Sequence, residues 1–168
     1  MNFTTKLFQQ VATLTVLGGF LWVIPSALAL SDEVNVEAFT ATKTIHFKFT
    51  HIQRSGVVHY SVYCDQKHYD MAGEVGSVST TEGLFPVLAN HDVIRSIEIS
   101  TQNPYCALLF YVDENGNNKL DRSRFLGLPK EGVGFSQLTS KPLSKPTWEA
   151  TRFEMSSTLT MSAQVFYY

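Results

Sequence analysis

The chain has 168 residues, of which 44% are hydrophobic and 17% are charged, and these values are ordinary for a globular protein. Such a length predicts one domain rather than several. The formal net charge is -2, and no basic stripe with interleaved aromatic residues is present, so the sequence lacks the pattern of a nucleic-acid-binding protein. We therefore expect partners other than nucleic acid.

The N-terminal segment has the three parts of a secretory signal peptide. Lys6 gives a positive start, residues 11–24 are mostly apolar, and residues 26–29 supply small side chains in an Ala-x-Ala pattern. The apolar run is shorter than the roughly 20 residues of a membrane helix, although an uncleaved anchor is the alternative. We expect residues 1–29 to be removed as a signal peptide. Residues 30–168 would then form a single exported domain, periplasmic or extracellular, with no membrane span after cleavage.

Two cysteines, Cys64 and Cys106, follow this segment. An even pair in an oxidising compartment predicts a disulfide. Cys64 shares its parity with Tyr60 and Val62, and Cys106 shares its parity with Leu108, so both side chains can face inward. A bond between them would stabilise the fold by about 4 kcal/mol in the chain-entropy model. The alternative is a pair of buried free thiols.

Period-two alternation predicts strands in the first half of the exported chain. Apolar and polar residues alternate over 45–49 and, after a turn at 54–56, again over 57–64. Residues 65–92 have no sustained period, and we expect a short helix or an irregular strand within them, because structureless loops of that length are uncommon in compact domains. Alternation resumes over 93–100.

The second half of the chain contains an almost entirely apolar run, residues 105–112, which predicts a central strand buried on both faces. Two prolines in residues 137–147 predict a surface loop, and residues 148–155 and 159–167 are the last expected strands. About seven short strands without an amphipathic helix predict an all-β fold. We expect an antiparallel β-sandwich of the immunoglobulin or transthyretin type.

A polar loop follows the central run directly. In a calcium-binding loop, side-chain oxygens at the first, third, fifth and ninth positions converge on one point, and these positions are Asp113, Asn115, Asn117 and Asp121. The seventh position contributes only its backbone carbonyl, so Lys119 is acceptable there. These five residues are the predicted calcium site, and calcium is the only cofactor that we expect.

Other positions of the loop leave its role open. Arg124 occupies the twelfth position, where such loops carry a bidentate glutamate. Glu131 could fold back to supply that carboxylate, or it could be a solvated partner for Lys130 or Arg124. Asn118, at the sixth position, tolerates the left-handed backbone that the sharp turn needs. Asn115-Gly116 is also a strong hairpin-turn signal. The loop is therefore predicted as a tight turn, a calcium site or both.

A resemblance to a known family rests on two runs. The first is Tyr-Cys-Ala-Leu-Leu-Phe-Tyr-Val-Asp-Glu-Asn-Gly-Asn-Asn-Lys-Leu-Asp, which starts at Tyr105, and the second is Leu-Gly-Leu-Pro-Lys-Glu-Gly-Val-Gly-Phe-Ser, which ends at Ser136. Together they resemble the signature of a bacterial exported family known as domain of unknown function 2141. The resemblance implies a small export-targeted β-sandwich and brings no assigned activity, substrate or catalytic residue. The chain departs from the family pattern at Cys106 and Val112.

No nucleophile–base spacing, Gly-x-Ser-x-Gly elbow or zinc-ligand spacing is present, and His59 falls on the polar face of its strand, where we expect it in solvent. We therefore predict a non-enzymatic protein with a structural or interaction role, whose partner is an unknown protein or glycan of the cell envelope. The alternative is a carbohydrate- or peptide-binding module that uses exposed aromatic residues, with Tyr69, Phe85 and Trp148 as candidates. The glycine-rich run 127–134 is a further candidate binding surface.

Overall fold

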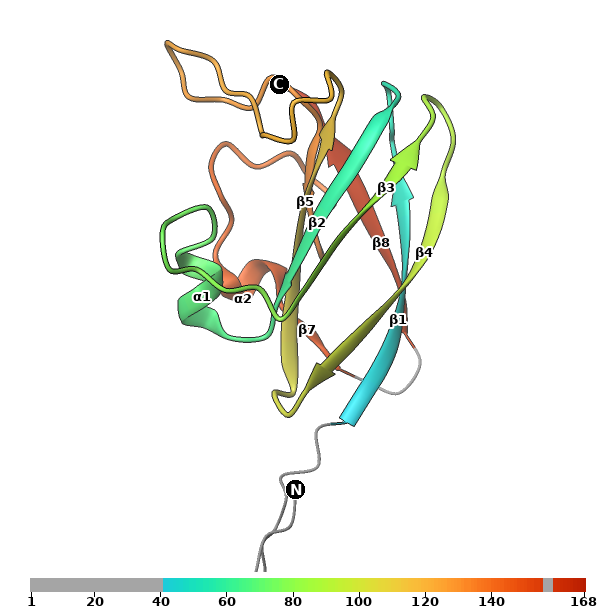
Figure 1. Ribbon diagram of the computed structural model, residues 1–168, viewed down its shortest axis with the longest axis vertical. Coiled ribbons are helices and arrows are strands. Elements are labelled where there is room, and N and C mark those ends of the chain that lie inside the picture. Colours follow the sequence, from blue (N-terminus) through green and yellow to red (C-terminus); the bar gives the residue numbers. More distant parts are fainter. Residues whose placement is uncertain (1–40, 156–158) are drawn as a thin grey trace, which may run out of the picture. The chain divides into compact units, whose positions relative to one another are not determined.

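The computed structural model describes residues 41–155 and 159–168, so the predicted signal peptide lies outside the described residues. The described part consists of strands and two short helices: β1 (Ala41–Thr50), β2 (Gly56–Tyr63), α1 (Gln66–Asp70), β3 (Thr81–Val87), β4 (Val93–Thr101), β5 (Tyr105–Asp113), β6 (Val133–Phe135), α2 (Trp148–Thr151), β7 (Phe153–Glu154) and β8 (Leu159–Phe166) (Figure 1). Neither of these helices has the length and apolar character needed to cross a membrane. The predicted all-β class is confirmed.

Hydrogen bonding joins the strands into one path, β3-β2-β5-β6-β8-β1-β4, with β7 beside β5. Neighbouring strands are antiparallel except β1 and β8, which are parallel. The sheet curls until its two end strands approach each other, and Thr81 Oγ1 donates a hydrogen bond to the Glu98 carbonyl at 3.3 Å. The result is a nearly closed, barrel-like sheet (Figure 1). The finer prediction of an antiparallel sandwich is therefore not confirmed, because the strands form one continuous sheet rather than two.

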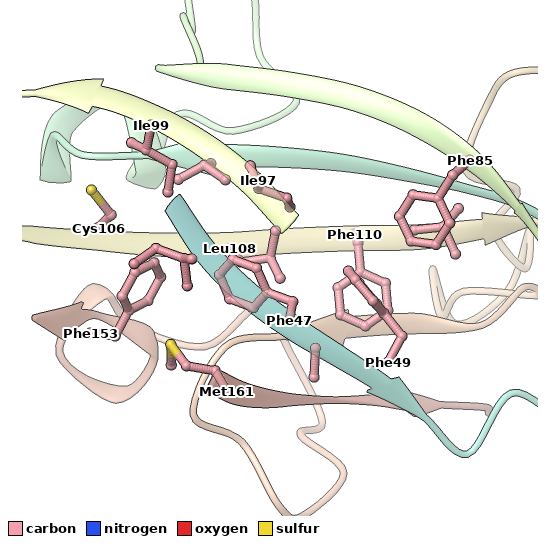
Figure 2. Packing of buried hydrophobic residues seen from close by; sticks show 14 of the residues in the cluster. Phe47, Phe49, Phe85, Ile97, Ile99, Cys106, Leu108, Phe110, Phe153 and Met161 are labelled. Atoms are coloured by element: carbon pink, nitrogen blue, oxygen red, sulfur yellow. The ribbon is translucent and has the colours of Figure 1, made fainter. Parts of the chain in front are cut away.

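The interior contains the side chains of β1 that the alternation predicted to face inward, together with residues of β3 and β5. Phe49 packs edge-on against Phe85 and Phe110, with ring centroids 5.0 and 4.9 Å apart, and Phe47 lies beside Leu108 in the same cluster (Figure 2). Burying a side chain of this size stabilises the fold by roughly 1.5–3 kcal/mol. The aromatic residues of β1, β3 and β5 therefore hold opposite walls of the curled sheet together.

Residues 65–92, expected to contain a short helix or an irregular strand, contain both α1 and β3. Asp65 caps the helix, since its carboxylate accepts the backbone N–H of His68 at 3.0 Å. Strand β3 lies at one end of the sheet path, and it carries Pro86, which has no N–H to donate. The position of β3 at an edge therefore agrees with its sequence.

The alternative that relied on three exposed aromatic residues is wrong. Tyr69, Phe85 and Trp148 are all buried rather than exposed. Tyr69 of α1 packs against Trp148 of α2, with ring centroids 5.5 Å apart, while Phe85 faces the interior of the sheet. The expected strand over 148–155 accordingly begins as a helical turn, which brings Trp148 onto Tyr69, and only β7 is extended. None of the three rings is available as an exposed ligand platform.

Strand β6 has three residues, yet it connects β5 to β8. A Cβ atom at Gly134 would collide with the ring of Phe110 and with the backbone carbonyl of Gln164. Glycine is thus required here for close approach of neighbouring groups, whereas Gly127, with φ of 65°, needs its conformational freedom. Gly127 and Gly134 thus serve different purposes within the 127–134 run.

Cys64 and Cys106 form a disulfide across a sequence separation of 42 residues, as predicted. Both side chains are buried, and the bond joins the residue that follows β2 to the second residue of β5. These two strands also pair through backbone hydrogen bonds. The covalent link therefore reinforces a contact that the sheet already makes.

Replacing both Cys64 and Cys106 by alanine is expected to lower the free energy of unfolding by about 4 kcal/mol, because the unfolded chain regains the entropy of the open loop. Urea denaturation of the wild-type chain with and without a thiol reductant provides the matched comparison. The oxidised wild type should unfold at the highest urea concentration, and the reduced wild type should behave like the double variant. An unchanged midpoint in both would refute the stabilising role of the bond.

Candidate functional site

Asp113 ends β5, and its carboxylate organises the loop that follows. The side chain is 2% exposed. Its Oδ1 accepts the backbone N–H groups of Gly116 at 2.7 Å and Asn117 at 3.2 Å, while Oδ2 accepts the N–H of Asn118 at 2.8 Å. Successive N–H groups that converge in this way form a concave site for negative charge. The chain thus wraps around one buried carboxylate.

Two residues of this loop have a left-handed backbone. Gly116 has φ of 75° and Asn118 has φ of 58°. Asparagine is one of the few non-glycine residues that adopts this region readily, so the prediction for Asn118 is confirmed. Both residues donate to Asp113, and the left-handed geometry is what turns their N–H groups toward the carboxylate.

Two glutamates fasten the loop to the start of β6. Glu131 is 3% exposed, and its two oxygens accept the N–H groups of Glu114 at 3.1 Å and Asp121 at 3.0 Å. Glu114 returns the contact by accepting the N–H of Gly132 at 3.1 Å. The alternative that placed Glu131 in solvent is therefore wrong. A buried carboxylate is costly unless it is hydrogen-bonded, and here each oxygen of Glu131 has a donor.

The residues predicted to hold calcium lie in this loop, and three of their side chains meet. Asp121 Oδ2 accepts the amide nitrogens of Asn115 at 2.7 Å and Asn117 at 3.2 Å, and Asn117 Oδ1 accepts the N–H of Lys119 at 2.8 Å. Asp113 stands apart, with both of its oxygens bonded to the backbone. Within the described residues no three His, Cys, Asp or Glu side chains are grouped as metal ligands. The loop as it stands is held by hydrogen bonds.

The hydrogen bonds also set the acidity of Asp113. Burial on its own would raise the pKa of this carboxyl, but the backbone N–H groups of residues 115–118 favour the charged form. Together they outweigh burial, so the pKa lies below its ordinary value. A folded-state pKa below the unfolded-state value contributes stability that is present above about pH 4 and is lost as the pH falls through the folded-state pKa.

Beside the loop lies a half-open pocket of about 540 Å³. Its floor is the outer face of the sheet, formed by β2, β5 and β6, and its walls are residues 120–129 and residues 143–145. The loops of both walls lie on one side of β2 and β5 (Figure 1). The floor residues are His59, Ser61, Tyr63, Leu109, Tyr111, Val133 and Phe135. Cavities of roughly 300–1,000 Å³ are typical of small-molecule sites.

The wall formed by residues 120–129 is itself well ordered. Arg122 and Pro129 form an isolated β-bridge, and the N–H of Ser123 donates to the Leu128 carbonyl at 2.8 Å. Glu131 holds the base of this wall, because one oxygen of its carboxylate accepts the N–H of Asp121. The buried acidic groups beside the pocket therefore fix its shape.

The pocket is lined mainly by apolar side chains. Five leucines contribute to it, and they are Leu109, Leu120, Leu126, Leu128 and Leu143. Leu126 is 75% exposed and Leu143 is 87% exposed, one on each wall, and the neighbouring Phe125 is also exposed. Large exposed apolar side chains that gather at one place mark a site of interaction. The polar residues of the lining include Arg122 and Lys145.

His59 lies at the pocket floor, and the prediction that it is solvated is wrong. Its ring stacks on Tyr111, with centroids 4.9 Å apart, and Nε2 lies 3.7 Å from Asp113 Oδ2. Nε2 is buried and has no hydrogen-bond partner among the described residues. One sequence signal could have shown this. Since the β5 run is apolar on both faces, a neighbouring strand must also be covered on the face that it shares with β5.

Asp113→Asn is expected to lower the free energy of unfolding at neutral pH by about 2 kcal/mol, because it removes the charge that several backbone N–H groups share. The stability of the wild type should fall below about pH 4, and the variant should lack this part of the pH dependence. Denaturant melts at several pH values give the measurement. Asp121→Asn is the control, since that side chain is partly exposed and accepts from two amide side chains. Equal pH dependence in wild type and Asp113→Asn would contradict the assignment.

Comparison with known proteins gives a family but no relative of known activity. Residues 50–162 match the family described as "Uncharacterized protein conserved in bacteria (DUF2141)". The match spans both cysteines, the polar loop and most of the pocket lining. No curated protein and no solved structure matches the chain. As the match covers well over half of the sequence and agrees with the resemblance of the 105–136 run, the chain belongs to the bacterial DUF2141 family.

Proposed function

We propose that the domain is an exported, non-catalytic binding protein that holds the apolar part of a small ligand in the pocket beside the polar loop. The observation that carries this proposal is the pocket of about 540 Å³ with exposed leucines on both walls. Apolar surface that is removed from water on binding contributes roughly 25 cal/mol of favourable free energy per Å². A ligand that covers Leu126 and Leu143 would gain from both walls at once.

The scaffold supports such a role because the pocket floor is rigid. Strand β5 is paired on both sides, and the disulfide fixes its start to the end of β2. Binding sites commonly use loops that a rigid scaffold positions. The disulfide is also compatible with an oxidising compartment, and this supports export to the periplasm or beyond. An envelope protein or glycan as the ultimate partner stays a prediction.

The groups beside the pocket favour binding over catalysis. A base that acts in catalysis is normally oriented by a hydrogen bond of about 2.6–3.2 Å. The distance between His59 and Asp113 is 3.7 Å, and both oxygens of Asp113 already accept backbone N–H groups. Asp113 therefore hydrogen-bonds to the loop backbone rather than to the imidazole, and this arrangement supports the non-enzymatic proposal.

Binding of the uncharged fluorophore Nile red is expected to be saturable, with one site per chain, because its apolar ring system fits the lining. Leu126→Asp and Leu143→Asp should each weaken binding by about tenfold or more, since a charge would replace an apolar contact. Fluorescence titration of the disulfide-bonded chain measures the affinity.

The matched control is Leu84→Asp. Leu84 is also largely exposed, but it belongs to β3 and does not line the pocket. This variant should bind Nile red like the wild type. Titrations without saturation, or an equal loss of affinity in all three variants, would rule out the pocket as the binding site.

Calcium binding by the Asp113–Asp121 loop is a second, independent proposal. The convergence of Asn115 and Asn117 on Asp121 supports it, because a cation placed there could draw on the oxygens of all three side chains. The side-chain amide N–H groups that now approach Asp121 would have to turn away. Calcium would then stabilise the loop without taking part in ligand binding.

With a calcium dissociation constant of about 0.1 mM, a concentration of 10 mM should stabilise the fold by about 2.7 kcal/mol and raise Tm by roughly 8 °C. Thermal melts with calcium and with a chelator test this. Asp121→Asn keeps the shape of the side chain and should abolish the rise. A wild-type Tm that is the same in calcium and chelator would mean that hydrogen bonds alone order the loop.

A further inference from the structure

The charged side chains that line the pocket have the same sign. Arg122 and Lys145 are the Lys and Arg residues of the lining, and no Asp or Glu belongs to it. From residue 119 to residue 145 the sequence has six Lys or Arg and two acidic residues, Asp121 and Glu131, although the whole chain has a net charge of -2. Glu131 is buried and bonded to the backbone. The pocket thus carries two cations on a chain that is acidic overall, and Asp70 and Glu74 are the acidic residues near Lys145.

Both lining cations have donors to spare. Arg122 is exposed, and one of its guanidinium nitrogens donates to the Gly127 carbonyl at 3.0 Å. A guanidinium carries five N–H donors, and its planar fork matches a carboxylate. The Lys145 ammonium donates to the carbonyls of Tyr69 and Asp70, which leaves one of its three donors. Each cation can therefore bond an anion without giving up its present contact.

A neutral ligand would suit this pocket less well than an anionic one. A ligand that fills the pocket partly desolvates the charged groups of Arg122 and Lys145. Desolvation of a charge is costly unless the charge gains a partner. Burial already lowers the pKa of Lys145, against the opposing charges of Asp70 and Glu74. An anionic head between the two side chains would offset the loss of water, whereas a hydroxyl or a cation would not.

We propose that the pocket binds a free single-chain amphiphile, an aliphatic chain that ends in a carboxylate. This inference rests on the proposed function. The aliphatic chain of the ligand lies along the leucines of the two walls, and its carboxylate lies between Arg122 and Lys145. The ligand is a free molecule rather than a lipid of a bilayer, because the apolar lining is concave and is shared between two facing walls. The two cations of the lining also favour the approach of an anion.

The test displaces bound Nile red with three ligands of equal chain length: decanoate, decanol and decyltrimethylammonium, all below their micelle or solubility limits. Decanoate should displace the fluorophore at about tenfold or more lower concentration than decanol, because charge-assisted hydrogen bonds are the stronger kind. Decyltrimethylammonium should be the weakest competitor.

Variants of the lining cations assign the effect to residues. Arg122→Gln should lower the affinity for decanoate by about tenfold and leave the affinity for decanol unchanged. Arg122→Lys should lose less affinity for decanoate than Arg122→Gln. The matched control is Arg124→Gln, which removes an exposed charge of the same loop that does not line the pocket. A thermal melt of each variant confirms that it folds.

The possible failures are distinct. If Nile red alone binds saturably at the pocket, and decanoate and decanol displace it equally well, the proposal of an anionic ligand is overturned and the proposal of a binding pocket stands. The absence of saturable Nile red binding would overturn both. Co-sedimentation with phosphatidylglycerol vesicles that requires Leu126, together with no displacement by decanoate, would show that the anion belongs to a bilayer and would overturn the free ligand.

Discussion

Strand β5 is buried on both faces, and the rest of the structure depends on this constraint. Its even-numbered side chains fill the interior of the curled sheet, while Leu109 and Tyr111 on its other face form part of the pocket floor. A strand covered on both faces needs a cover on the outer side as well, and the loops after β5 and β6 supply it. The pocket is the space that this cover leaves open.

Three acidic residues in and beside the polar loop accept hydrogen bonds from the backbone. Asp113, Glu114 and Glu131 each accept backbone N–H groups, and together they hold the loop against the start of β6. A loop without regular secondary structure leaves N–H groups that must be satisfied, and carboxylates satisfy them with strong, charge-assisted bonds. The rigidity of one pocket wall and the sharp turn after β5 therefore have the same origin.

Local patterns were sufficient for the long strands β1, β2, β4, β5 and β8, for the disulfide and for the left-handed Asn118, because each depends on residue parity or on the preference of a single residue. The single continuous sheet could not be predicted, since it depends on the pairing of Ile45 in β1 with Leu159 in β8, far apart in sequence. Glu131 and His59 were misplaced for a related reason. Their burial depends on what covers them, and alternation along one strand does not report the neighbouring segments. The pocket is built from several segments, and of these only the 127–134 run was predicted from the sequence as a candidate binding surface.

The parallel pairing of β1 with β8 has a consequence for folding. Synthesis delivers β1 first, but its partner on one side, β8, follows only after every other strand has been made. Until then Phe47 and Phe49 lack part of their cover, and contacts between segments so distant in sequence form slowly. The β2–β5 half, with its disulfide, can assemble earlier. The new chain therefore passes through a stage in which an apolar strand edge is exposed, and it is most prone to aggregation at that stage.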